Sequence, residues 1–214
     1  MFVSNWMTKK VIALGPDDSI SDAITLMKEK GIKHLPIVKN DKLKGIVSDR
    51  DIKEFSPSKA TTLDIYELHY LLAKTKIKDM MKTQVITTAS DTPVEEAALM
   101  MLDQNIGCLP VVDLGKLVGI ITDKDIFSAL VDITGVRHGG IRIDVTLEDR
   151  PGSIREVADA FRKHGFRLRS ILSSYEGVKD GYREVVLRTA GTGNFKGLKE
   201  ELETTYKNVQ VSKG

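Results

Sequence analysis

The chain has 214 residues and a formal net charge of +2, with 41% hydrophobic and 29% charged residues. This composition is ordinary for a globular protein of one or two domains, and the small charge gives no sign of a nucleic-acid-binding arm or a membrane-surface patch. Cys108 is the single cysteine, so no intrachain disulfide can form and a reducing cytoplasm is the expected compartment. No apolar run approaches the 18 residues of a membrane span, and no signal-peptide pattern opens the chain.

One stretch of the sequence occurs twice. GIVSDRDI, which begins at Gly45, aligns with GIITDKDI, which begins at Gly119, after a shift of 74 positions. The match extends back without a gap to Met7 and Met81. Such a duplication indicates that one supersecondary unit was used twice.

The first repeat, residues 7–55, has the pattern of a β-α-β-β-α unit. Its helix is predicted from apolar residues at i, i+3, i+4 and i+7, beginning at Ile20. We expect, in order, a strand at 11–14, a helix from the N-cap Asp18 to Gly31, strands at 35–38 and 43–47 around an Asn40-Asp41 turn, and a helix capped by Ser48 or Asp49.

The second repeat, residues 81–131, carries the same elements. Thr92 as N-cap, Pro93 in the first turn and Glu95 as a capping-box acid predict the start of its first helix. Between the repeats, residues 56–80 are expected to form a helix over 63–73, with a weak capping signal from Thr61 and Asp64. This helix is expected to pack between the repeats or at a dimer contact; a lid over a ligand is the alternative.

The C-terminal segment, residues 138–214, has a different spacing of apolar residues from the two repeats. Apolar and polar residues alternate over 141–148, which predicts a half-buried strand. We expect next a turn at 149–153, a helix over 154–161 that ends at Gly165, strands at 166–175 and 182–189, a helix around 195–202 and a last strand at 209–211. The resulting order, β-α-β-β-α-β, is that of a ferredoxin-like fold, also called a split β-α-β fold.

The duplicated pattern, strand–helix–(h-P-h-h)–turn–(G-h-h-[ST]-D-x-D-h), resembles the CBS domain, a βαββα module that occurs in tandem pairs. The resemblance implies an α+β fold in which an α/β-type CBS pair forms two clefts related by pseudo-twofold symmetry. It also implies that the clefts bind adenosine compounds: AMP, ADP, ATP or S-adenosylmethionine.

The resemblance implies a set of nucleotide-binding residues as well. It gives Asp51 and Asp125 as ribose-binding acids, Ser48 and Thr122 as phosphate-side hydroxyls, and Arg50 and Lys124 as cations between them. Against the base it gives Ile12, Ala13, His34 and Leu35 from one copy, and Ile86, Thr87, Cys108 and Leu109 from the other. Carboxylates bind vicinal ribose hydroxyls in other nucleotide folds, and a hydroxyl with backbone N–H groups at a helix start suits phosphate. A purely structural role stays open, because an acid in the first turn stabilises a helix by up to ~1 kcal/mol.

The C-terminal segment resembles the ACT domain in its D-R-P-G-S turn and the following H-G-F-R-L. This implies an amino-acid site bordered by Asp149, Gly152, Ser153, Ile154 and Gly165, with dimerisation through a sheet edge as the alternative. Two CBS copies followed by an ACT domain resemble the acetoin-utilisation AcuB-type CBS–ACT proteins. The resemblance implies a regulatory homodimer with an unidentified partner protein and a role in acetoin utilisation, but it does not establish a reaction.

We therefore expect a regulatory ligand-binding protein rather than an enzyme, with adenosine nucleotide as a regulatory ligand and no required cofactor. The sequence has no phosphate-binding loop of the GxxxxGK[ST] type, and its histidines lack the spacing of a metal site. The alternatives are a small enzyme acting on acetoin or a nucleotide, with Asp51 and His34 as its acid–base pair, or a ligand-free dimerisation scaffold. His34 and Cys108 occupy equivalent positions in the repeats, so we expect them in different clefts.

Overall fold

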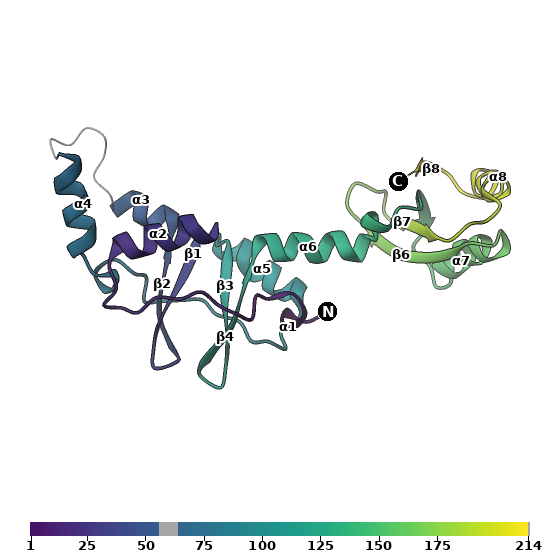
Figure 1. Ribbon diagram of the computed structural model, residues 1–214. Coiled ribbons are helices and arrows are strands. Elements are labelled where there is room, and N and C mark those ends of the chain that lie inside the picture. Colours follow the sequence, from purple (N-terminus) through teal and green to yellow (C-terminus); the bar gives the residue numbers. More distant parts are fainter. Residues whose placement is uncertain (56–63, 214) are drawn as a thin grey trace. The chain divides into compact units, whose positions relative to one another are not determined.

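The computed structural model describes residues 1–55 and 64–213. These residues form two compact units, Met1–Phe127 and Ser128–Gly214, which we describe separately (Figure 1). The duplicated segments lie in the first unit, and the boundary falls within helix α6 (Asp123–Thr134).

The first unit contains the duplicated helix–hairpin–helix pattern that the sequence predicts. The hairpin β1–β2 and the hairpin β3–β4 lie side by side (Figure 1), and β2 contacts β4. The elements are α1 (Val3–Trp6), α2 (Ile20–Lys30), β1 (His34–Lys39), β2 (Lys42–Ser48), α3 (Asp49–Phe55), α4 (Ile65–Lys74), η1 (Ile77–Asp79), α5 (Val94–Gln104), β3 (Cys108–Asp113), β4 (Lys116–Thr122) and α6 (Asp123–Thr134).

The strands predicted at 11–14 and in the equivalent part of the second repeat are single bridges. Leu14 pairs with Ile37 and Thr88 pairs with Val111, each in parallel. Leu14 donates to the carbonyl of Pro36 and accepts from Val38 at 2.8 Å. The next bond of the ladder would need an N–H on the proline, which has none, and the pairing therefore stops.

Two helix starts differ from the predictions by one residue. Ser19, not Asp18, is the N-cap of α2, because Ser19 and Asp22 form a reciprocal capping box, while Asp18 accepts from the N–H of Gly15 at 2.6 Å. In the second repeat the N-cap position is held by Pro93, and α5 begins at Val94. Gly31 ends α2 in the left-handed conformation, as expected.

Helix α4 forms most of the predicted insert helix. It is capped by Asp64, which accepts from Tyr66, while the carboxylate of Glu67 accepts from the N–H of Asp64 at 3.1 Å. Thr61 lies outside the described residues. Leu68 and Leu72 pack into the core of the first repeat, so the helix lies on that repeat rather than between the two. A dimer contact or a lid role stays a prediction.

The two repeats exchange their first segments. Thr8 forms two backbone hydrogen bonds with Ile120 of β4, at 2.9 and 3.0 Å, and Lys82 forms two with Ile46 of β2, both 3.0 Å. Each segment therefore extends the hairpin of the other repeat. A Cβ atom on Gly45 would collide with the sulfur of Met81, so glycine is needed for this close approach.

The second unit has the predicted order β-α-β-β-α-β. Its four strands form one antiparallel sheet with the order β6-β7-β5-β8. The elements are the end of α6, η2 (Val136–His138), β5 (Ile141–Glu148), α7 (Ser153–Lys163), β6 (Arg167–Ser174), β7 (Tyr182–Ala190), α8 (Phe195–Thr205) and β8 (Gln210–Lys213).

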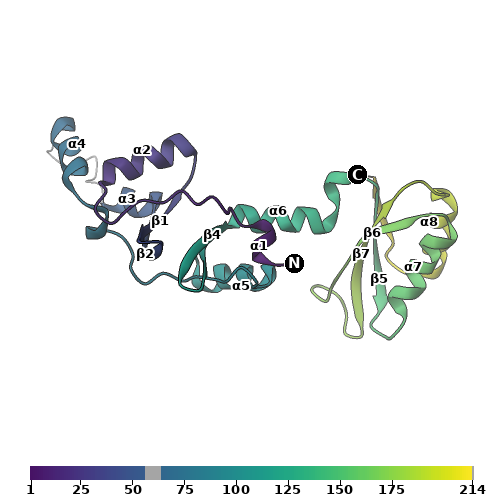
Figure 2. The same cartoon turned by 60° about the horizontal axis from the view of Figure 1, so that its bottom comes forward.

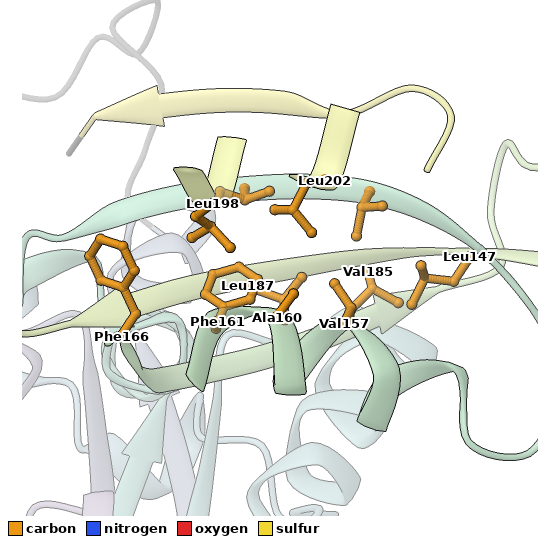
Figure 3. Close-up of a cluster of buried hydrophobic side chains, with 11 residues drawn as sticks. Leu147, Val157, Ala160, Phe161, Phe166, Val185, Leu187, Leu198 and Leu202 are labelled. Atoms are coloured by element: carbon orange, nitrogen blue, oxygen red, sulfur yellow. The ribbon is translucent and has the colours of Figure 1, made fainter. Parts of the chain in front are cut away.

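Helices α7 and α8 lie together against one face of this sheet (Figure 2). Side chains from both helices and from β5 and β7 meet in the core between them, with Phe161, Leu187 and Leu198 fully buried (Figure 3). Val157 and Phe161 of α7 are fully buried in this core, whereas Ala158 is only half-buried.

Among the described residues, none of the helices combines the length and the apolar character needed to cross a membrane.

Candidate functional site

A cavity of about 520 Å³ lies in the first unit, where the two repeats meet. We call it the first cleft. Six of the residues predicted to bind a nucleotide line it: His34, Ser48, Arg50, Asp51, Ile86 and Cys108. The turn formed by residues 48–51 of the first repeat, which we call its acid turn (residues 122–125 in the second repeat), thus faces residues of the second repeat.

Asp51 is fixed at the start of α3 by the turn that precedes it. Its Oδ2 accepts hydrogen bonds from the backbone N–H of Ser48 at 2.8 Å and from the Ser48 hydroxyl at 2.5 Å. The Ser48 oxygen accepts in return from the N–H of Asp51 at 3.2 Å. Lys82, carried beside this turn by its pairing with Ile46, places Nζ 2.7 Å from Oδ1. Both carboxylate oxygens therefore have partners within the protein.

These contacts determine the ionisation of Asp51. Burial alone would raise its pKa, but the hydrogen bonds from Lys82 and Ser48 and the Lys82 charge outweigh burial and hold the pKa below its usual value. The side chain is a carboxylate at neutral pH, suited to accept hydrogen bonds from vicinal hydroxyls and unsuited to act as a general acid.

The second repeat builds the same acid turn. Asp125 Oδ2 accepts from the backbone N–H of Thr122 at 2.8 Å and from the Thr122 hydroxyl at 2.7 Å. Lys124 lies between them in the first turn of α6 and is exposed. The 74-residue shift places Asp125 at the position equivalent to Asp51, and a second cleft beside Asp125 stays a prediction.

His34 and Cys108 line the same cleft, which corrects the expectation that symmetry separates them. They begin β1 and β3, and the two strand starts meet where the repeats join, so one cavity reaches both. Gly107, next to Cys108, lies beside the His34 ring.

Their ionisation excludes a reactive cysteine. Burial raises the pKa of the Cys108 thiol to about 12, with a smaller contribution from Asp123. Burial also lowers the pKa of His34, against the opposing effect of Asp123 and other nearby carboxylates. At neutral pH the cleft therefore contains a protonated thiol and a neutral imidazole, and the thiolate needed for nucleophilic attack is scarce.

The remaining predicted residues lie elsewhere. The side chains of Leu35 and Leu109 are fully buried in the cores of their repeats, so only their backbone can face a ligand. Ile12, Ala13 and Thr87 are half-buried and are outside the first cleft.

Sequence reasoning missed Lys82 and Asn105, which also line the first cleft. The repeat alignment could have indicated Lys82, because a lysine stands here where the other repeat has the uncharged Thr8. The two residues lie at the start of the matched segments.

In the second unit, a polar cavity of about 810 Å³ lies beside the end of β5 and the start of α7. Of the residues predicted for an amino-acid site, Ser153 lines it, and its hydroxyl accepts from Arg183 at 2.9 Å. Asp149, Gly152 and Ile154 adjoin it in sequence but do not line it. Gly165 follows the far end of α7, about 16 Å away along a helix of this length. One copy of the chain does not bring all the predicted residues together.

No cluster of three or more His, Cys, Asp or Glu side chains that could hold a metal ion occurs within the described parts of the chain.

The CBS domain family model matches residues 3–58 and 77–132, just over half of the chain. The chain belongs to the CBS-domain family. The two matched segments each include one acid turn and one hairpin.

Three relatives illustrate how this module is used. A CBS domain-containing protein of Dictyostelium discoideum is 31% identical over 62% of this chain and 93% of its own length. An uncharacterised protein of Methanocaldococcus jannaschii is 29% identical over 77% of this chain, and the alignment covers 62% of that protein. An inosine-5'-monophosphate dehydrogenase of the same organism is 36% identical over 55% of this chain, but only 21% of the enzyme is covered.

Three solved structures are also similar. A putative acetoin utilization protein (AcuB) from Vibrio cholerae has a TM-score of 0.55 and 34% identity, over 64% of this chain and 96% of that one. CBSX2 in complex with AMP has a TM-score of 0.51 and 32% identity, over 62% of this chain and 97% of that one. The CBS domain pair of protein MJ0100, with 5-methylthioadenosine and S-adenosyl-L-methionine, has a TM-score of 0.51 and 30% identity, over 62% of this chain and 97% of that one.

Proposed function

We propose that this protein is a regulatory ligand-binding protein that senses adenosine compounds in its CBS clefts. The observation that carries the proposal is the first cleft, in which an ionised, hydrogen-bonded Asp51 faces a cavity of about 520 Å³ lined by both repeats. That volume lies within the range of ordinary small-molecule sites. Two structurally similar CBS proteins hold AMP or S-adenosyl-L-methionine, which supports the same ligand class here.

In the proposed complex, the Asp51 carboxylate accepts hydrogen bonds from the ribose hydroxyls. Ser48 and Arg50 lie on the phosphate side, and the base contacts the apolar surface around Ile86. Asp125, Thr122 and Lys124 have the corresponding roles in the second cleft. The candidate ligands of the two clefts are AMP, ADP, ATP and S-adenosylmethionine.

Thermal unfolding in the presence of these compounds tests the proposal. A ligand that binds only the folded state raises stability by RT ln(1 + [L]/Kd), about 2.7 kcal/mol at a hundredfold excess over Kd. We expect stabilisation by at least one adenosine compound and none by the matched pyrimidine nucleotides. If the adenosine compounds and the pyrimidine nucleotides changed the stability equally, or not at all, the proposal would be contradicted.

We further propose that the second unit is an ACT module that binds an amino acid or mediates homodimerisation. Its β-α-β-β-α-β order and the Gly152 turn into α7 support this assignment. Isothermal titration with the proteinogenic amino acids, combined with light scattering, tests both roles. A monomer that binds none of them would contradict the assignment. A role in acetoin utilisation is supported only by the similarity to the Vibrio cholerae protein.

An enzymatic role has weaker support. Asp51 and His34, the candidate acid–base pair, both line the first cleft. However, Asp51 is held as a carboxylate by Lys82 and Ser48, and the aligned dehydrogenase shares only a fifth of its length with this chain. Incubation with acetoin or ATP, followed by product analysis, distinguishes an enzyme from a sensor.

A further inference from the structure

The two acid turns differ in one neighbouring side chain. Lys82 pairs with Ile46 two residues before Ser48, and Thr8 pairs with Ile120 two residues before Thr122. Lys82 and Thr8 therefore hold equivalent positions beside the two acids. One position carries a positive charge and the other a neutral hydroxyl.

Lys82 interacts directly with the acid of the first cleft. Its Nζ lies 2.7 Å from Oδ1 of Asp51, and the two side chains are 66% and 11% exposed. The lysine is held at its tip and solvated along its length, so the ammonium can move while Asp51 stays fixed by Ser48. The other cation of the turn, Arg50, is paired with Glu54 at 2.8 Å.

A ribose that binds Asp51 must therefore share the carboxylate with Lys82 or displace it. Displacement leaves an ammonium ion in the cleft without its partner. A phosphate on the ligand supplies a new negative partner for that ammonium, whereas an uncharged nucleoside supplies none. A cationic ligand adds repulsion.

We propose that Lys82 is a specificity-determining residue that makes the first cleft select phosphorylated adenosine ligands over uncharged or cationic ones. The second cleft, with Thr8 at this position, lacks a lysine equivalent to Lys82, so this source of selection is absent there. This inference rests on the proposed nucleotide-binding function. The second cleft has lysines of its own, because Lys10 and Lys33 align with Gln84 and Gly107 of the first cleft, which are uncharged. The inference therefore concerns the lysine that is paired with the acid, and not the total charge of either cleft.

Reciprocal swaps at this position isolate its effect. In an Asp125→Ala background, which leaves the first cleft as the binding site, AMP and adenosine are titrated by calorimetry against protein with Lys82 and with Lys82→Thr. Because Lys82 is largely exposed, we expect AMP to bind about five- to tenfold more weakly to the Lys82→Thr variant. Adenosine should bind no more weakly, and Lys82→Arg should retain the preference for AMP.

The converse swap, Thr8→Lys in an Asp51→Ala background, should strengthen AMP relative to adenosine in the second cleft. Thermal melts of each variant verify that the first unit is folded. If AMP binds but either swap leaves the AMP-to-adenosine ratio unchanged, the inference about Lys82 is overturned while the proposed function stands. If the unmutated protein binds neither compound, the proposed function itself fails.

Discussion

Replacement of Asp51 by alanine removes the carboxylate that organises the start of α3. The Ser48 N–H and hydroxyl lose their acceptor, and Lys82 loses its ion partner. We expect the variant to remain folded, to lose binding in the first cleft, and to be measurably less stable.

The size of the loss follows from these contacts. Loss of a helix-capping side chain costs about 0.5–2 kcal/mol. The pair with Lys82 is largely solvent-exposed on the lysine side and adds at most about 1 kcal/mol. The sum is about 0.5–3 kcal/mol for Asp51→Ala. Asp125→Ala, whose turn has the same two hydrogen bonds from Thr122 but no paired lysine, should cost about 0.5–2 kcal/mol.

The loss depends on pH with a definite sign. The pKa of Asp51 is depressed in the folded chain. The stability that Asp51 contributes is therefore fully present above the unfolded aspartate pKa of about 3.9, and it disappears as the pH falls through the lower folded value. The difference between the wild type and Asp51→Ala should be largest near pH 7 and smaller near pH 3.

Urea unfolding followed by the fluorescence of Trp6 measures this difference. Trp6 is the single tryptophan and packs on the core of the second repeat, so its signal reports the first unit. Asp125→Ala is the matched control. A free energy of unfolding for Asp51→Ala within 0.5 kcal/mol of wild type at pH 7 would refute the energetic reasoning.

Three further predictions concern other parts of the chain. Cys108, with its pKa raised to about 12, should react with a thiol reagent at pH 8 at least a hundredfold more slowly in the folded protein than in urea, and equal rates would exclude the buried placement. Glu201 has its pKa lowered by hydrogen bonding to Lys163, so Glu201→Gln should lower the melting temperature of the second unit more at pH 7 than at pH 3.5. The stability that the carboxylate contributes is fully present above the unfolded glutamate pKa of about 4.3 and is lost as the pH falls through the lower folded value, so a uniform effect would contradict this pairing. Gly45→Ala should destabilise the first unit by about 1–3 kcal/mol because its Cβ meets Met81, and the double variant with Met81→Ala should cost less than the two single changes added together; strict additivity would mean that the contact is absent.

The sequence alone was sufficient for the duplicated fold and the order of the C-terminal elements. The motif of a glycine, a hydroxyl residue and an acid has the same internal spacing in both repeats. In both copies the hydroxyl donates a hydrogen bond to the acid, Asp51 or Asp125. The strand predicted at 11–14 was wrong because apolar character does not reveal that Pro36, on the neighbouring strand, cannot donate to the ladder.

The site was only partly predictable. Its acid turns are local in sequence, but the cavity joins residues from both repeats, and a repeat-by-repeat analysis separated His34 from Cys108. Lys82 reaches Asp51 through the exchanged pairing with Ile46, a contact between distant segments that periodicity does not encode.

The most direct test of the account is a crystal structure of the full chain grown with millimolar AMP. The account predicts AMP in the first cleft, with its ribose hydroxyls on the Asp51 carboxylate and Lys82 moved from Asp51 toward the phosphate. A folded first unit whose cleft contains no AMP at that concentration, and equally none of ATP or S-adenosylmethionine in parallel crystals, would contradict it.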